Sequence, residues 1–396
     1  MAEKKKVLFI NYSLHSGGIE KSLVTVLSLF DYEKYDVDLQ LFANDGMFLS
    51  RVSPKVNLLP PLFPAEYKWN IRKAFFALLM KGHPLIALCR LLVTIAGLRG
   101  SMGDRLVRMW NVEKRFIRTA KKEYDAVVAF MEGQPIYYAV TKVKSRNKIG
   151  FIHGDYIAMG LNQQFDIAFI EELNALCTVS ESCKTALEKT FPKNTNKFHV
   201  VYNIISSTFM RSMAQEPVNF EDDFIGTRIL SIARLSHQKG LDLAIPAIAS
   251  LKKEGLKFKW YIIGIGPEEA NLKAMIQELG IADYVGFLGE RSNPYPFLKA
   301  CDIYLQPSRF EGKSIAVDEA MVMCRPILLT DFSTAKDQIN SGENGLIVPM
   351  TSEGIADGLK ELLLSSDRRA DFTAALEKCD YTNENEIDKL YALINR

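Results

Sequence analysis

Two glutamates, Glu311 and Glu319, stand eight positions apart in the stretch SRFEGKSIAVDEAM. The run DIYLQPS just before them is typical of a strand, and the apolar run around Glu319 is typical of a helix. Glu311 therefore precedes a helix N-terminus, where the first backbone amides have no helical partner and can bind an anion. We expect the amides of Gly312, Lys313 and Ser314 to be free for this purpose.

The two carboxylates indicate a sugar ligand. A carboxylate repels phosphate, but it accepts hydrogen bonds from two adjacent hydroxyl groups, so Glu311 suits a sugar. A buried Glu319 needs polar partners, which a ribose diol supplies. A capping acid and a solvated helix glutamate would give the same two residue types, because acids are common in first helical turns.

Two cations occur in another loop that follows a predicted strand. In SIARLSHQKGLDLAI, Arg234 and Lys239 flank a turn that ends at Gly240 and opens a helix. Cations beside a helix N-terminus suit a diphosphate, although a solvated turn would look the same. The loop IIGIGPEE contains Gly264 and Gly266, and a G-x-G without a third glycine is as consistent with a plain tight turn as with a ligand site.

The bulk composition is that of a globular protein with two to three domains. The chain has 396 residues, a net charge of +2 and six cysteines. None of the cysteines forms a C-x-x-C pair, so we expect neither disulfides nor a zinc site. The first apolar run, VLFI, is too short for a signal peptide, and no window supplies the roughly 20 apolar residues of a membrane span. We therefore expect a cytoplasmic protein.

The order of the predicted elements indicates an α/β fold. Short apolar runs such as KKVLFINYS and KFKWYIIGIG alternate with helical patterns, which is typical of βαβ units and doubly wound parallel sheets. The alternation restarts after the polar stretch 212–226, so we expect two such domains joined near residues 203–226. Ligands of open α/β sheets bind at the carboxyl ends of the strands, which is where both candidate loops lie.

Several motifs together carry a resemblance to a known family. The pattern from Pro307 through Glu311 to Glu319 resembles the E-x7-E signature of the retaining glycosyltransferases of family four, which have the GT-B fold. HSGGIEKS resembles the family's glycine loop, FIHGDY its histidine motif, ARLSHQKG its Arg…Lys clamp, and SGENGLIVP its late glycine loop. The resemblance covers about residues 5–375.

The resemblance implies an architecture. We expect two Rossmann-like domains that face a central cleft, with a C-terminal helix that returns to the first domain. Residues 1–203 would form the N-terminal, acceptor-side domain, residues 204–375 the nucleotide-sugar-binding domain, and residues 376–396 the returning helix.

The resemblance also implies residue roles. The catalytic residues would be His153, Arg234, Lys239 and Glu311. The donor-binding residues would be Gly17, Gly18, Gly264, Gly312, Lys313, Ser314, Ile315 and Glu319. Two positions leave an alternative open: His153 also fits a satisfied structural histidine, and Lys313 departs from the apolar residue of many relatives.

The implied activity is transfer of a sugar, with retention of configuration, from a nucleotide sugar such as a UDP-sugar to a glycan or lipid-linked acceptor in surface polysaccharide synthesis. A nucleotide-sugar epimerase and a non-catalytic sugar-nucleotide-binding homologue are the alternatives. We expect no metal or other cofactor. The only D-x-D, at Asp36 and Asp38, begins an alternating strand, and we interpret it as structural.

The positive charge is concentrated in one segment. Residues 68–122 contain 13 Lys and Arg against 2 acids, a balance of +11, which leaves −9 for the remainder. Basic helices with aromatic residues bind anionic membranes, and each basic residue adds about 1 kcal/mol. We therefore expect peripheral association with the inner face of the cell membrane. Core helices with basic outer faces are the alternative, and nucleic acid is not expected, because no motif for it occurs.

Overall fold

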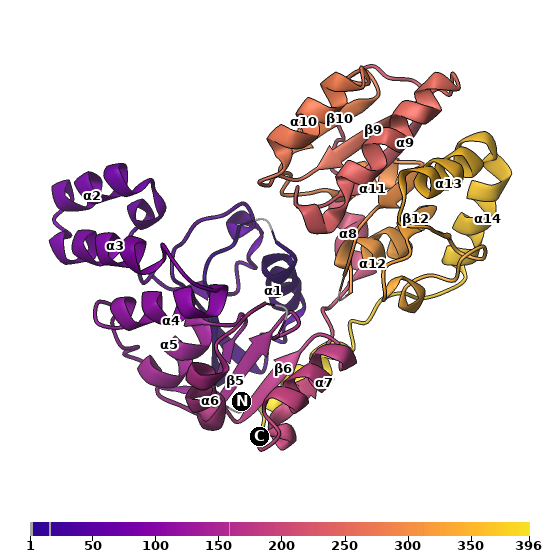
Figure 1. Cartoon of the computed structure of the whole chain (residues 1–396). Coiled ribbons are helices and arrows are strands. Elements are labelled where there is room, and N and C mark those ends of the chain that lie inside the picture. The colour runs from indigo at the N-terminus through magenta and orange to yellow at the C-terminus, as the bar shows by residue number, and fades with distance from the viewer. Residues whose placement is uncertain (1–2, 16, 158, 312) are drawn as a thin grey trace. The chain divides into compact units, whose positions relative to one another are not determined.

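The chain forms two units, and each is built on its own parallel sheet (Figure 1). The computed structural model describes residues 3–15, 17–157, 159–311 and 313–396. Unit 1 comprises Met1–Ile204 and Glu384–Arg396, and unit 2 comprises Ile205–Asn383. The first boundary lies one residue from the predicted one. Residues 376–383, which we had assigned to the returning C-terminal segment, belong to unit 2.

Unit 1 contains a seven-stranded sheet in the order β3-β2-β1-β4-β5-β6-β7. Its strands are β1 (Lys5–Asn11), β2 (Tyr35–Leu41), β3 (Asn57–Leu58), β4 (Tyr124–Ala129), β5 (Ser145–Ile152), β6 (Ala175–Thr178) and β7 (Phe198–Val200). In β1, Val7 and Phe9 join one hydrophobic core, whereas Leu8 and Ile10 join another. The sheet therefore has a core on each face, and this explains why its strands appear in the sequence as continuous apolar runs.

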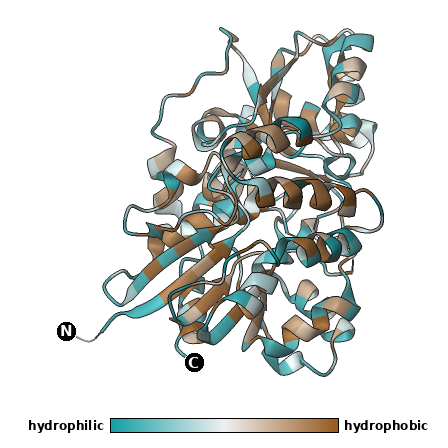
Figure 2. Cartoon of the chain, turned by 90° about the vertical axis from the view of Figure 1, so that its left-hand side faces the viewer, coloured by the Kyte–Doolittle hydropathy of each residue, from teal (hydrophilic) through white to brown (hydrophobic). Residues whose placement is uncertain are grey.

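Helices connect the strands of unit 1 and cover the sheet. They are α1 (Gly18–Leu29), α2 (Ile71–Met80), α3 (Pro84–Ala96), α4 (Met102–Glu113), α5 (Gln134–Lys142), α6 (Gln163–Glu172), α7 (Glu181–Thr190) and α15 (Glu386–Ile394), with the 3-10 turns η1 (Leu49–Arg51), η2 (Ala65–Lys68) and η3 (Thr195–Lys197). The basic segment begins at the last residue of η2 and forms α2–α4. Figure 2 turns the side with α2 and α3 toward the viewer and shows hydrophobic residues along these helices. None of the helices among the described residues is long and apolar enough to cross a membrane.

Asp38, from the D-x-D motif, has a structural role, as predicted. It lies within β2 and is 3% exposed. Its carboxylate accepts hydrogen bonds from the hydroxyl of Tyr124 at 2.7 Å, from Lys122 Nζ at 2.9 Å and from Asn57 Nδ2 at 2.9 Å. These three donors hold the pKa of Asp38 below its usual value despite burial, which acts in the opposite direction. Its polar atoms are therefore used to join β2, β3 and the start of β4.

Unit 2 contains a six-stranded parallel sheet in the order β10-β9-β8-β11-β12-β13. Its strands are β8 (Thr227–Ile232), β9 (Phe258–Ile263), β10 (Val285–Gly289), β11 (Ile303–Gln306), β12 (Ile327–Thr330) and β13 (Leu346–Val348). Its helices are α8 (Ser207–Met213), α9 (Leu241–Lys253), α10 (Glu269–Glu278), α11 (Tyr295–Ala300), α12 (Ile315–Val322), α13 (Ser352–Leu364) and α14 (Ser366–Glu377), with the 3-10 turns η4 (His237–Lys239) and η5 (Ala335–Asp337). Since β8 and β11 are neighbours, the loops after them lie at the same edge of the sheet.

The C-terminal helix α15 completes the core of unit 1, as predicted for the helix that returns. Leu390 and Leu393 are 1% and 4% exposed within that core. The Tyr391 ring stacks on Tyr35 with the centroids 5.3 Å apart. The Leu393 carbonyl accepts a hydrogen bond from Asn147 Nδ2 at 2.6 Å, which joins the helix to β5.

We predict that Leu390→Ala destabilises unit 1 by about 2–5 kcal/mol, because it removes a fully buried side chain and leaves a cavity. Hydrogen exchange followed by mass spectrometry should show faster exchange in β1 and β5, while the strands of unit 2 serve as an internal reference. Leu364→Ala, at a position of α13 that is 64% exposed, is the matched control. Equal exchange in the two variants would show that α15 does not stabilise unit 1.

Candidate functional site

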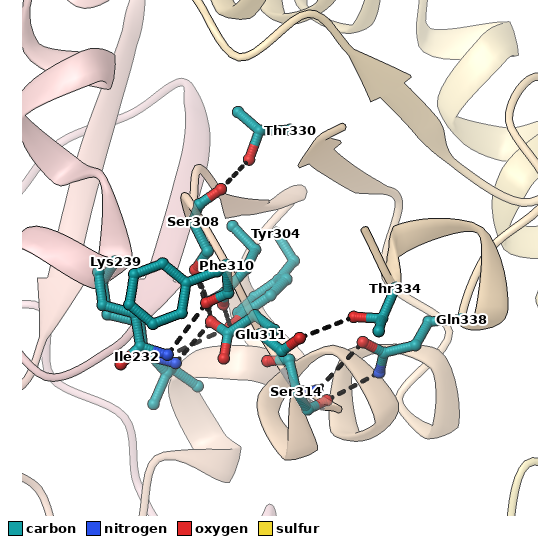
Figure 3. Close-up of polar contacts among 12 residues, drawn as sticks. Ile232, Lys239, Tyr304, Ser308, Phe310, Glu311, Ser314, Thr330, Thr334 and Gln338 are labelled. Atoms are coloured by element: carbon teal, nitrogen blue, oxygen red, sulfur yellow. Dashed lines mark hydrogen bonds and ion pairs between the residues drawn. The ribbon is translucent and has the colours of Figure 1, made fainter. Parts of the chain in front are cut away.

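The carboxylate of Glu311 lies at the centre of the candidate site in unit 2 (Figure 3). Its Oε1 atom accepts three hydrogen bonds, from Lys239 Nζ at 2.6 Å, from Ser308 Oγ at 2.6 Å and from Gln306 Nε2 at 3.0 Å. The side chain is 7% exposed. Among the residues that the structure describes, no donor reaches Oε2. One oxygen therefore fixes the carboxylate, and the other is available to a hydroxyl of a ligand.

The two predicted cations have different environments. Lys239, at the end of η4, forms an ion pair with Glu311, so the predicted diphosphate cation and the predicted sugar-binding carboxylate are in direct contact. Arg234 lies on the same loop and is exposed, and within the described ranges no carboxylate pairs with it. The loop therefore presents one cation tied to Glu311 and one with its charge uncompensated.

A second ion pair, which the sequence did not reveal, joins the loop after β11 to the start of α9. Arg309 donates to both carboxylate oxygens of Asp242, at 2.7 and 2.6 Å. Its backbone amide donates to the Gln238 carbonyl at 2.8 Å, and Gln238 Nε2 donates back to the Phe310 carbonyl at 3.0 Å. Hydrogen bonds from Arg309 hold the pKa of Asp242 below its usual value. The loop that carries Lys239 and the loop that carries Glu311 are thus fixed to each other.

Two glycines allow the loops after β8, β9 and β11 to pack closely. Gly240 has φ +61°, and a Cβ there would lie 1.9 Å from the Pro307 carbonyl oxygen. Gly264 has φ +142°, and its Cβ would lie 2.0 Å from the Ala233 carbonyl oxygen. Both positions exclude a side chain, since backbone atoms cannot give way. The steric requirement at Gly264 thus comes from loop packing, and its predicted contact with a donor stays a prediction.

Glu319 is buried in α12, as its apolar surroundings indicated, with 3% exposure. Its Oε1 atom accepts a hydrogen bond from the Tyr295 hydroxyl at 3.0 Å. Burial and the nearby carboxylate raise the pKa of Tyr295 well above its usual value, so the hydroxyl keeps the proton that it donates. A protein side chain therefore supplies a partner that we had expected from a ligand. No sequence pattern pointed to Tyr295.

The N-terminus of α12 differs from the prediction of free amides. The Ser314 amide donates to Gln338 Oε1 at 3.1 Å, and Gln338 Nε2 donates to the Ser314 carbonyl at 2.9 Å and to Asp318 Oδ1 at 2.8 Å. Lys313 Nζ lies 3.0 Å from Asp318 Oδ2. The prediction for the Ser314 amide was wrong, because a side chain 24 positions away caps it. Gly312 lies outside the described residues.

Two threonines, one at the end of β12 and one in the loop after it, hold the Glu311 loop from its other side. Thr330 donates to the Ser308 carbonyl at 2.6 Å, and Thr334 donates to the Glu311 carbonyl at 3.1 Å (Figure 3). Ile315, the last of the predicted donor-binding residues in this loop, is half-buried as the first residue of α12. The position of Glu311 is therefore set by contacts from the loop after β8 and from the end of β12 and its following loop, on both sides of β11.

The remaining predicted residues belong to unit 1. His153 follows β5, and its Nε2 atom lies 3.0 Å from the Phe130 carbonyl oxygen. Burial lowers the pKa of His153 to about 4, so the imidazole is neutral near pH 7 and donates Nε2–H to that carbonyl. Its backbone amide donates to Glu132 Oε2 at 3.3 Å. Gly17 caps α1 and Gly18 begins it.

Comparisons with known proteins identify relatives of this chain. Residues 220–378 match the family model described as glycosyl transferases group 1. The chain is 26% identical over 362 residues to the N-acetylgalactosamine-N,N'-diacetylbacillosaminyl-diphospho-undecaprenol 4-alpha-N-acetylgalactosaminyltransferase of Campylobacter jejuni, with 91% of this chain and 90% of that protein covered. It is 36% identical over 145 residues to the amylovoran biosynthesis glycosyltransferase AmsK of Erwinia amylovora, with 35% of each chain covered.

Solved structures share the fold. Anabaena Alr3699/HepE in complex with UDP and glucose aligns over 98% of both chains with a TM-score of 0.68, at 17% sequence identity. WaaG, a glycosyltransferase involved in lipopolysaccharide biosynthesis, aligns with a TM-score of 0.62 over 98% of this chain and 99% of that one. These similarities confirm the predicted GT-B fold with two Rossmann-like units.

We predict that Arg309→Ala loosens the loop after β11, because the ion pair with Asp242 and the bond to the His237 carbonyl are both lost. Amide exchange in residues 307–311 should quicken at least about tenfold, as expected for a partly buried charged contact. Arg368→Ala is the matched control, since it removes an exposed ion pair with Glu361 elsewhere in unit 2. Similar exchange in these residues for both variants would contradict the role of Arg309.

Proposed function

Since the chain is a glycosyltransferase of the group 1, family-four type, we propose that it transfers a sugar from a UDP-sugar, with retention of configuration, to a glycan or lipid-linked glycan. One relative is named for a substrate on diphospho-undecaprenol, and another is named for amylovoran biosynthesis. Both names support this class of acceptor. A solved structure with the same fold that holds UDP and glucose supports the class of donor.

The arrangement of Glu311 carries the proposal. Its anchored carboxylate has one oxygen left to accept a hydrogen bond from a hydroxyl of the donor sugar. Such a preorganised acceptor costs little reorganisation when the sugar arrives. Glu319, held by Tyr295, is the second glutamate on the loop and helix that follow β11, and we assign it to the ribose of the nucleotide.

In the proposed reaction the bond between the anomeric carbon and the diphosphate oxygen breaks, and its electron pair remains on that oxygen. Arg234 and Lys239 stabilise the negative charge that develops on the leaving diphosphate. The acceptor hydroxyl oxygen bonds to the anomeric carbon on the same face, and its proton passes to the leaving phosphate oxygen. This front-face route needs no carboxylate nucleophile on the far face of the sugar.

His153 would act in its neutral form. Its low pKa excludes a permanent positive charge at neutral pH, so we assign it hydrogen bonding near the reacting sugar and not charge neutralisation. Arg234 and Lys239 then carry the task of charge compensation, and we propose that no metal ion is required.

We propose that the protein acts in the cytoplasm, at the inner face of the cell membrane. A lipid-linked acceptor is confined to a membrane, and the basic segment at residues 68–122 favours an anionic surface over nucleic acid.

The proposal is tested by incubating the protein with a panel of nucleotide sugars, with and without a glycan or lipid-linked acceptor, and analysing the products. Transfer that requires the acceptor is expected. Turnover of the donor without acceptor would indicate an epimerase, and binding without turnover in either case would indicate a non-catalytic homologue. A thermal-shift screen identifies the donor beforehand, because a ligand at 100 times its Kd adds about 2.7 kcal/mol of stability.

We predict that Glu311→Gln and Arg234→Ala each lower kcat/KM for transfer at least about 100-fold, as expected when a preorganised contact to developing charge is lost. Glu311→Gln keeps the volume of the side chain and one acceptor oxygen but removes the charge that pairs with Lys239. The melting temperature of each variant therefore separates lost transfer from lost folding. Arg368→Ala, at a half-buried position, and Glu278→Gln, at an exposed position of α10, are the matched controls in unit 2. Near wild-type rates in both site variants would rule out this donor site.

We predict that transfer persists in excess EDTA, because Arg234 and Lys239 neutralise the diphosphate. In the described part of the chain, no cluster of three or more His, Cys, Asp or Glu side chains has an arrangement suited to a metal. The measurement compares initial rates before and after chelation. Loss of activity that Mn²⁺ or Mg²⁺ restores would contradict the proposed mechanism.

A further inference from the structure

Helices α2 and α3, which pack against each other in unit 1, both expose large apolar side chains. We call this set the hairpin surface; its members are Phe76 (67% exposed), Met80 (88%), Leu85 (66%), Leu88 (44%), Leu92 (39%) and Ile95 (59%). On α3 the exposed members recur three or four positions apart, so they line one face of the helix. An exposed apolar helix face of this kind marks an interaction site on a folded protein.

The packing of α3 is the reverse of that of an ordinary surface helix. The side chains that it buries are small, Ala87, Cys89 and Val93. Its one charged residue, Arg90, is turned back toward the protein, where the guanidinium lies 5.7 Å from the Tyr67 ring centroid and donates to Thr94 Oγ1 at 2.6 Å. The outward face of α3 therefore carries no charge.

Cations flank the hairpin surface. Arg72 and Lys73 are exposed in the first turn of α2, and Arg99 and Arg105 are exposed after α3. Within the described ranges, none of these four has a carboxylate within ion-pair distance. Both acids of the segment are occupied elsewhere, since Glu113 is fully buried and Asp104 accepts from Asn162 Nδ2 at 2.9 Å. Other cations of the segment are paired, since Lys68, Lys81 and Lys122 lie on carboxylates of Asp45, Glu66 and Asp38. The uncompensated positive charge beside the apolar face is therefore that of the four arginine and lysine side chains named first.

The size of α3 limits how it can meet a lipid bilayer. Its 13 residues extend about 20 Å, at about 1.5 Å per residue. The hydrocarbon core of a bilayer is about 30 Å thick, so α3 is too short to cross it. A helix with one apolar face and cations at its borders lies parallel to the membrane, with the apolar face below the headgroups.

We propose that the hairpin surface docks unit 1 onto an anionic lipid bilayer, with the aliphatic face of α3 below the headgroups and the flanking cations on lipid phosphates. Charge complementarity selects this occupant over a second copy of the chain, because two equally basic surfaces repel each other. The inference rests on the proposed function in one respect, because docking would bring the protein to a lipid-linked acceptor.

The hairpin formed by α2 and α3 is firmly attached to the rest of unit 1. Leu78, Cys89 and Val93 are buried in the same core as Trp110 of α4. The Tyr67 hydroxyl, from η2, donates to the buried Glu113 carboxylate at 3.1 Å. Docking through the hairpin would therefore orient the whole of unit 1 on the membrane.

The test uses the full chain and vesicles of phosphatidylcholine, with or without phosphatidylglycerol, in a flotation assay. Leu88→Ser/Leu92→Ser/Ile95→Ser should lower partitioning into anionic vesicles at least about tenfold, because three exposed apolar side chains are lost. Ile225→Ser/Leu364→Ser, at positions that are 82% and 64% exposed on unit 2, should leave it unchanged.

A charge variant tests the flanking cations. Arg72→Glu, Lys73→Glu, Arg99→Glu and Arg105→Glu together should lower partitioning at least about 100-fold. The matched control reverses four exposed lysines elsewhere, Lys193, Lys253, Lys257 and Lys378. High salt should weaken binding of the wild type without abolishing it, since salt screens charges but not apolar contacts.

Trp69 provides an internal reporter. It is 47% exposed at the start of the hairpin, whereas Trp110 and Trp260 are fully buried. Its emission should shift to the blue when anionic vesicles are added, and lipids brominated on the acyl chain should quench it.

Three results would overturn the proposal. The first is equal binding of the protein to neutral and anionic vesicles. The second is equal binding by a hairpin variant and its control. The third is a dimer, detected by sedimentation velocity, that the serine substitutions dissociate, together with no binding of the protein to vesicles. Donor binding by thermal shift separates this test from the proposed function. Hairpin variants that keep the donor shift but lose vesicles support docking, whereas vesicle binding by a wild type that binds no nucleotide sugar refutes only the proposed function.

Discussion

The candidate site of unit 2 depends on one constraint, the adjacency of β8 and β11 in a parallel sheet. Lys239 and Glu311 are 72 positions apart, yet their loops leave neighbouring strands at the same edge of the sheet. That adjacency permits the ion pair, the close approach of Gly240 to the Pro307 carbonyl and the double hydrogen bond from Arg309 to Asp242. The two loops behave as one structural element, so the orientation of the Glu311 carboxylate is set before any ligand arrives.

The sequence predicted the parts of the site that are local. A parallel α/β fold followed from continuous apolar runs, and the loop–helix position of Glu311 and the burial of Glu319 followed from the residues around them. The partners of these groups did not follow. Tyr295 is 24 positions from Glu319, and Asp242 is 67 positions from Arg309, with no periodic pattern to connect either pair. The amide of Ser314 was wrongly expected to be free for the same reason, because Gln338 reaches it from another loop.

The basic segment shows a different limit of sequence reasoning. Its composition predicted helices with apolar and basic faces, and the structure contains α2, α3 and α4 there. Periodicity alone did not tell which face turns toward the protein. On α3 the small residues and the single arginine pack inward, and the large aliphatic residues remain outside. Only the tertiary packing against Tyr67 and Trp110 reveals this reversal.

The return of α15 to unit 1 has a consequence for biosynthesis. All residues of unit 2 precede α15 in the chain, so a ribosome finishes unit 2 before it supplies the last helix of unit 1. Domains usually fold as they emerge, the N-terminal one first. Here the N-terminal unit remains incomplete during synthesis, because part of its core stays exposed at the place that Leu390 and Leu393 later fill. Unit 2 can thus reach its native state during translation, whereas unit 1 can do so only after release of its final segment.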